Sequence, residues 1–195
     1  MHELSHSEMS LVVAVHEAGH AVACVRRGVP IKGVTLGGSQ DAPQGVGPGT
    51  LTEPIGVEGC RGMDAGVMER YRFQAIVCLA GRIAEETAFR SGLTKAVGYR
   101  SALKDERDAK LFVRSLAMAE LRALEFEGAD PRGNATLDQL PAISVRLLAE
   151  CRGEAERLVI ENWSAIEAVA RKLANSGALT GDEVASLVAA AGCGV

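Results

Sequence analysis

The sequence predicts a mainly helical fold with one small β-sheet, an α+β arrangement. Three observations lead to this expectation: long segments with apolar residues at helical spacing, stretches rich in glycine and proline between them, and one short alternating segment after the first helix. The chain has 195 residues, of which 47% are hydrophobic, and is long enough to bury a core. We therefore expect residues 1–195 to form a single domain.

The first helix is expected over residues 7–27. Ser5 and Glu8 have the spacing of a capping box, which satisfies free N–H groups at a helix start. Gly28 followed by Pro30 is a typical end signal, since glycine permits the reversal and proline cannot continue the helix.

Two short strands are expected next. Residues 31–36 alternate between apolar and other side chains, residues 37–48 are rich in glycine and proline, and residues 50–52 form a return strand. This pattern predicts a small sheet beside the first helix.

Further helices make up the rest of the predicted fold. Apolar periodicity predicts them over residues 63–89, 102–126 and 138–175, with a loop at 91–99 and a break at 128–134. Thr180 and Glu183 again have capping-box spacing, which predicts a last short helix.

Charge and hydropathy exclude several classes of function. The net charge of -4 is spread without long runs of one sign, so we expect no nucleic-acid partner. No apolar stretch approaches the length of about 20 residues that a membrane span requires, and the N-terminus lacks the pattern of a signal peptide. We expect a cytoplasmic protein without a direct membrane span.

The five cysteines are widely separated and include no C-x-x-C pair, which favours reduced thiols over disulfides or a thiolate metal site. Cys24 follows His20 by four residues, so it lies on the same predicted helical face. It is an alternative metal ligand, although small buried cysteines are common.

His16-Glu17-Ala18-Gly19-His20 is the most informative segment of the chain. A helix turns about 100° per residue, which places the two imidazoles on one face, where they can bind one Zn²⁺. Glu17 points near the same ion without having to bind it, as expected of a general base. The pattern is the H-E-x-x-H signature of zinc peptidases.

A second copy of this signature, His2-Glu3-Leu4-Ser5-His6, lies at the N-terminus. Chain ends fray unless they are tied down, whereas apolar residues flank the internal copy on both sides. We interpret the terminal copy as adventitious. The simpler alternative for the internal copy is two core histidines satisfied by hydrogen bonds.

A zinc site with an open position for water needs a third protein ligand, and no histidine remains outside the two motifs. The ligand must therefore be a carboxylate. Spacing alone leaves five candidates open, namely Asp64, Glu85, Glu86, Asp105 and Asp108.

A resemblance to a known family narrows this choice. Residues 15–22, then Val34-Thr35-Leu36, then residues 79–86 (LAGRIAEE) resemble the peptidase domain of the FtsH family of zinc metalloproteases. Residues 161–184 are similar to the closing helices of that family. The resemblance implies a zincin-like metal helix within an FtsH-type helical peptidase domain. It also implies Asp105, with Ala109 one turn later, as the third ligand.

The resemblance has limits. FtsH proteins carry a membrane segment and an AAA ATPase, and this sequence contains no G-x-x-x-x-G-K-[ST] phosphate-binding loop. We expect a stand-alone peptidase domain that works without ATP in this chain. A separate ATPase or unfoldase and a homo-oligomer are possible partners.

The predicted function is a zinc-dependent metalloendopeptidase with a polypeptide substrate. His16, His20 and Asp105 hold the ion, and Glu17 is the catalytic base. Glu85 and Glu86 are candidates for orienting a ligand histidine, with ordinary surface charge as the alternative. A peptide could add as a strand to the edge near residues 45–52, or that segment is an ordinary surface loop.

Two other hypotheses stay open at this point. One is a catalytically silent zinc-binding regulatory or adaptor protein with the same fold. The other is a zinc peptidase of another family that uses Glu85 or Glu86 as its third ligand.

Overall fold

The computed structural model describes residues 6–36, 49–52, 65–98, 100–126 and 134–192. Six helices and three strands occur in this part of the chain, in the order α1 (His6–Arg26), β1 (Ile31–Thr35), β2 (Gly49–Thr52), α2 (Ala65–Arg90), α3 (Arg100–Phe126), α4 (Asn134–Glu161), α5 (Trp163–Ser176), β3 (Ala178–Thr180) and α6 (Gly181–Gly192). The prediction of a mainly helical protein with a small sheet is confirmed.

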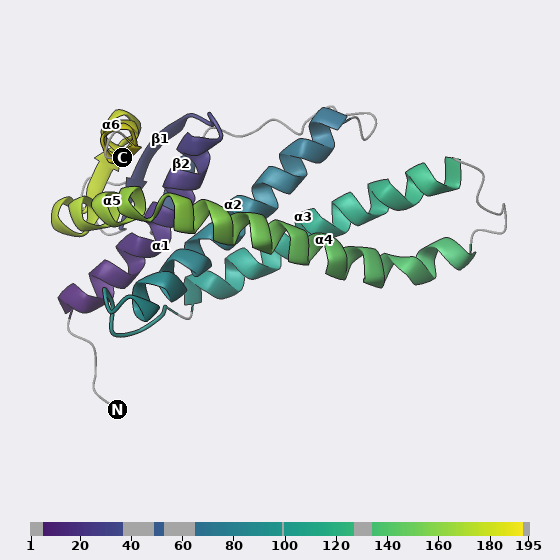
Figure 1. Cartoon of the computed structure of the whole chain (residues 1–195), viewed down its shortest axis with the longest axis horizontal. Helices are drawn as coiled ribbons and strands as arrows, with labels where there is room; N and C mark the ends of the chain where they lie inside the picture. Colours follow the sequence, from purple (N-terminus) through teal and green to yellow (C-terminus); the bar gives the residue numbers. More distant parts are fainter. Residues whose placement is uncertain (1–5, 37–48, 53–64, 99, 127–133, 193–195) are drawn as a thin grey trace, which may run out of the picture.

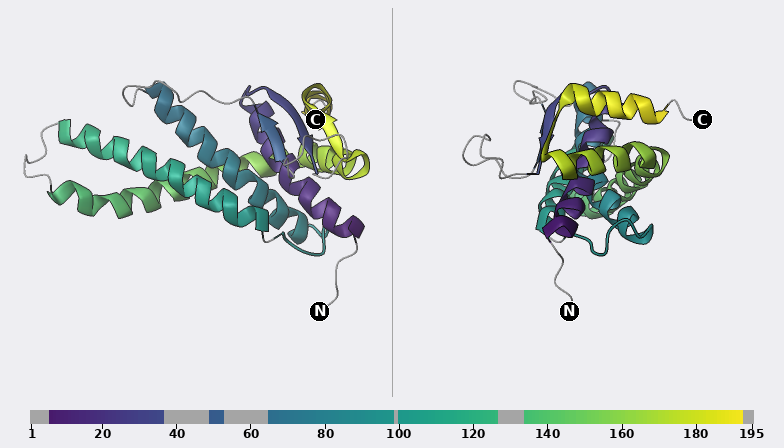
Figure 2. Two further views of the ribbon diagram at one scale, coloured as in Figure 1. Left: turned by 180° about the vertical axis from the view of Figure 1, so that it is seen from behind. Right: turned by 90° about the vertical axis from the view of Figure 1, so that its left-hand side faces the viewer.

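The helices form an elongated bundle with the sheet at one end. Figure 1 shows α3 and α4 as a long antiparallel pair that extends beyond the other helices, while α5, α6 and the sheet lie at the opposite end. Figure 2 shows the same arrangement from behind and end-on. α1 packs against both α2 and α5 and also contacts β1. This central place makes α1 the most buried element.

The burial of α1 also explains its composition. The window Glu8–Arg26 has a mean hydropathy of 1.2 and is long enough to cross a membrane, so the expectation that no segment approaches this length is wrong. In the structure 67% of that window is buried inside the fold, as for the core helix of a soluble protein. The absence of a membrane span stays a prediction.

β1 is the central strand of the sheet. It pairs antiparallel with β2 on one side and with β3 on the other, in the order β2-β1-β3. Two of its residues explain how β3 comes so close: Val34 is buried against the core, and Gly33 lets Leu179 approach, since a Cβ at position 33 would lie 2.7 Å from the Leu179 carbonyl oxygen. β3 is only three residues long and was not predicted from the sequence.

The prediction of one continuous helix over residues 138–175 is wrong. Residues 138–175 form parts of two helices, α4 and α5, which are separated at Asn162. The Asn162 side chain donates to the carbonyl of Leu158 at 2.8 Å and accepts from Arg26 Nε at 2.5 Å, which ties this point of the chain to the end of α1. The break lets α4 pack on α2 and α3, while α5 packs on α1.

The helix ends otherwise follow the sequence signals. Glu183 Oε2 accepts from the Thr180 backbone N–H at 2.8 Å, and the Thr180 hydroxyl accepts from the Glu183 N–H at 3.3 Å. This is the predicted capping box of α6. The other predicted capping box includes Ser5, which lies outside the described residues. Gly28 has φ +70, as expected for the glycine that ends α1.

Candidate metal centre

His16 and His20 stand one turn apart on α1 and are both buried. Their Nε2 atoms lie 3.0 Å apart, and their rings are nearly perpendicular, at 88°. The two imidazoles therefore present ring nitrogens to a common point, as the motif predicts.

Asp105 on α3 completes the group. Its Oδ2 lies 2.8 Å from His16 Nε2 and 3.4 Å from His20 Nε2. With metal–ligand bonds of about 2.0–2.2 Å, the ligand atoms of a tetrahedral site stand roughly 3.3 Å apart, close to these separations. The group of His16, His20 and Asp105 could hold a metal ion.

The other carboxylates singled out in the sequence lie elsewhere. Glu86 pairs with Arg82 at 2.9 Å, and Asp108 pairs with Lys104 at 3.3 Å. Glu85 contacts His16 through Nδ1, the ring nitrogen that faces away from Asp105. Asp64 is outside the described residues. Among the described candidates, Asp105 is the carboxylate that meets both histidines.

The outer nitrogen of each histidine also has a partner. His20 Nδ1 donates to the backbone carbonyl of Val77 on α2 at 2.7 Å. His16 Nδ1 lies 2.7 Å from Glu85 Oε1, within ion-pair distance, although the N–H direction falls outside hydrogen-bond geometry. In the neutral form with its proton on Nδ1, each ring would have its Nε2 lone pair on the side of Asp105, the orientation that metal ligands require.

This concentration of acceptors favours a positive charge at the centre. Burial lowers the pKa of His16, but contacts with Asp105 and Glu85 outweigh it and raise the pKa to about 9. Burial raises the pKa of Asp105, but its contacts with His16 and His20 outweigh this and hold it below its ordinary range. A proton supplies the charge in the metal-free protein, and a bound cation would replace it.

Glu17 lies in the same buried part of α1, only 4% exposed. Its charge is close enough to contribute to the raised pKa of His16. It does not belong to the group of ligand atoms found among the described residues.

Cys24 does not join the group either, and burial raises the pKa of its thiol to about 12. Cys24, Cys78 and Cys151 are all free cysteines.

Two glycines bring α1 and α2 close enough to build the centre. A Cβ at Gly81 would lie 2.5 Å from His20 Nε2 and 3.0 Å from His16 Cε1, so the α2 backbone is in contact with both imidazoles. A Cβ at Gly19 would lie 2.7 Å from the Ala80 carbonyl oxygen. The glycines of both motifs are therefore required by packing.

We expect Gly81→Ala to displace the histidines, because the added methyl group occupies the space of the rings. Overpacking of this kind costs about 1–3 kcal/mol, and bound metal should fall well below one ion per chain. Gly153→Ala is the matched control, since a Cβ at this helical glycine meets nothing within 4 Å. Thermal unfolding and metal content check both variants; unchanged metal content in Gly81→Ala would contradict this geometry.

Three contributors to the site were not predicted from the sequence. Gly81 had a signal, because a glycine within a helix costs about 1 kcal/mol and often marks close packing. The Val77 carbonyl had no sequence signal, because every residue has a backbone carbonyl. Arg82, which contacts Glu85, was quoted only as part of a motif.

No protein-family model matches this chain, and no curated protein sequence matches it. The case for a metal centre therefore rests on the geometry of His16, His20 and Asp105.

Proposed function

We propose that this protein is a zinc-dependent metallopeptidase in which His16, His20 and Asp105 hold the ion. The convergence of their three ligand atoms within 3.4 Å of one another carries the proposal. Two imidazoles and one carboxylate are a common donor set of catalytic zinc sites, which keep a fourth position open. A zincin-like metal helix in an FtsH-type peptidase domain is the fold that this proposal includes.

The reaction is hydrolysis of a peptide bond. When bound, zinc supplies a Lewis acid that polarises a carbonyl and makes water easier to deprotonate. Glu17 accepts the proton of the attacking water and then delivers it to the nitrogen of the leaving amine. Its burial beside His16 supports this role, because a carboxylate shielded from bulk water keeps the proton for the leaving group.

The substrate in this proposal is an extended polypeptide. β2 is an edge strand, which pairs with β1 alone among the described residues. An extended peptide could add to its outer edge through main-chain hydrogen bonds and so be bound with little sequence preference. Residues 45–48 of the predicted docking segment lie outside the described residues.

The working context is also part of the proposal. We place the protein in the cytoplasm and expect it to cleave unfolded chains without ATP. A separate ATPase or unfoldase would be needed for folded substrates, because this sequence has no phosphate-binding loop of the Walker type.

Chelation of the metal tests the proposed function. We expect the purified protein to contain one zinc per chain and to cleave casein without ATP. Treatment with 1,10-phenanthroline should remove at least about 99% of the activity, and zinc should restore it, since the ion supplies several kcal/mol of transition-state stabilisation. Stoichiometric zinc without cleavage would instead favour a silent zinc-binding regulatory or adaptor protein.

A further inference from the structure

Residues 91–98, which follow α2, lie against Glu85, the carboxylate that contacts His16 Nδ1. We call this segment the strap. Its start is tied to α2, where the Leu93 N–H donates to the Ala88 carbonyl at 2.9 Å. Further along, Lys95 Nζ pairs with Glu8 Oε1 of α1 at 2.5 Å. The strap is therefore anchored to the two helices that carry the histidines and Glu85.

The end of the strap covers the carboxylate of Glu85. A Cβ at Gly98 would lie 3.1 Å and 3.3 Å from the two Glu85 carboxylate oxygens, so the strap backbone is in direct contact with the side chain. Glu85 is only 1% exposed as a result. Neither of its carboxylate oxygens has a partner with hydrogen-bond geometry. A buried carboxylate in this state is costly unless an opposite charge lies nearby.

Arg82 places a positive charge beside Oε2, as His16 lies beside Oε1, and Arg82 also holds the strap. Its Nη1 donates to the Gly98 carbonyl at 2.9 Å and lies 3.7 Å from Glu85 Oε2. Its Nε donates to Glu86 Oε1 at 2.9 Å, which fixes the guanidinium plane. One side chain therefore joins the strap to the carboxylate that contacts His16.

We propose that Arg82 is a positioning residue of the metal centre that acts through Glu85 on His16. This inference rests on the proposed function, because it requires the histidines to hold a metal. Arg82 and Gly98 confine the Glu85 carboxylate to the place where Oε1 faces His16 Nδ1, 2.7 Å away. Without Arg82 the carboxylate loses its neighbouring positive charge and the clamp on Gly98, and the His16 ring loses its fixed orientation.

Cobalt binding by full-length protein tests this role, because Co²⁺ reports both affinity and ligand geometry. Loss of a direct partner of a ligand histidine lowers metal affinity by about 10–100-fold. Arg82 contacts Glu85 and not the histidine itself, so we expect Arg82→Gln to lower Co²⁺ affinity by about 3–10-fold. The visible absorption spectrum of bound Co²⁺ should change as well. Arg90→Gln is the control, since Arg90 pairs with Glu86 at 3.6 Å but not with Glu85 or the strap.

A double-mutant cycle separates this role from a general loss of stability. In the Glu85→Gln background, Arg82→Gln should have no further effect on Co²⁺ affinity, because its route to His16 is already broken. Gly98→Ala, which presses on the carboxylate with Arg82 intact, should change the spectrum in the same way. If Arg82→Gln does not fold, the Co²⁺ spectrum of Gly98→Ala tests whether the position of the Glu85 carboxylate controls the metal centre.

Three outcomes would overturn the inference. The first is that Arg82→Gln and Gly98→Ala both bind Co²⁺ with the affinity and the absorption spectrum of the wild-type protein. The second is that the effects of Arg82→Gln and Glu85→Gln on Co²⁺ affinity are fully additive. Both leave the proposed function intact if the wild-type protein binds metal and cleaves casein. The third is a wild-type protein that binds no metal, which overturns the proposed function together with this inference.

Discussion

Glu17→Gln is expected to bind zinc like the wild-type protein and to lose peptidase activity. The amide keeps the size of the side chain but cannot accept the proton of the attacking water. Removal of a general base costs about 10²–10⁴-fold in rate, so casein hydrolysis should fall to or below the limit of detection. Glu17 lies outside the group of ligand atoms, so the metal content should stay at one ion per chain.

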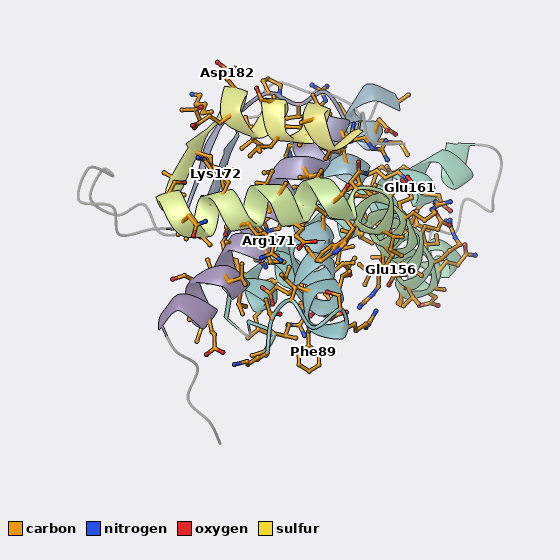
Figure 3. The ribbon with its side chains drawn as sticks, turned by 60° about the vertical axis from the view of Figure 1, so that its left-hand side comes forward. Phe89, Glu156, Glu161, Arg171, Lys172 and Asp182 are labelled. Carbon is orange, nitrogen blue, oxygen red and sulfur yellow. The ribbon has the colours of Figure 1, made fainter. Side chains whose placement is uncertain are left out.

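Glu167→Gln is a suitable control for the same chemical change. Glu167 lies on α5 and pairs with Arg171. Arg171 is labelled in Figure 3, where α5 faces the viewer. Exposed pairs of this kind contribute roughly 0–1 kcal/mol, and activity should stay within about twofold of wild type. Cleavage by Glu17→Gln at the wild-type rate would exclude Glu17 as the base.

Asp105→Asn is expected to abolish stoichiometric zinc binding and, with it, the activity. The change keeps the shape of the side chain but removes the negative charge that faces both histidines at 2.8 and 3.4 Å. Since loss of an outer partner already costs about 10–100-fold in metal affinity, loss of a ligand charge should cost more than about 100-fold. Competition with a chromophoric chelator measures the change.

Asp108→Asn is the matched control, because Asp108 lies on the same helix and pairs with Lys104. Its zinc affinity should match that of the wild-type protein within about twofold. If Asp105→Asn bound zinc as tightly as this control, the third ligand would have to be another carboxylate, such as Glu85 or Glu86.

Much of the local structure follows from short-range sequence signals. The bounds of α1 and α2 lie within two residues of those predicted, because apolar periodicity and the glycine at the end of α1 act locally. The Thr180–Glu183 capping box is likewise a contact between residues three positions apart. The pair of histidines is predictable for the same reason, since one turn of a helix fixes their spacing.

Other features depend on contacts between distant segments. At Asn162, between α4 and α5, the side chain accepts from Arg26 at the end of α1, a contact that no helical pattern in residues 138–175 reveals. β3 is too short to show alternation and exists because β1 offers it an edge. Five carboxylates were equivalent on spacing alone, and only the packing of α3 against α2, which itself packs on α1, brings Asp105 to the histidines.

Glu85 belongs to the surroundings of the metal centre, but hydrophobic periodicity alone does not predict its role. Glu85 falls on the apolar side of α2, where a pattern based on hydrophobicity treats a charge as an interruption. It is 1% exposed and lies against His16 Nδ1. A buried charge in such a place is informative, because burial of a carboxylate is costly unless it serves a partner.

Anomalous diffraction at the zinc edge from crystals of the zinc-loaded protein shows whether His16, His20 and Asp105 hold the ion. We expect one strong peak per chain at about 2.0–2.2 Å from His16 Nε2, His20 Nε2 and Asp105 Oδ2. A peak on other residues, or none at this place in protein that carries stoichiometric zinc, would contradict the account.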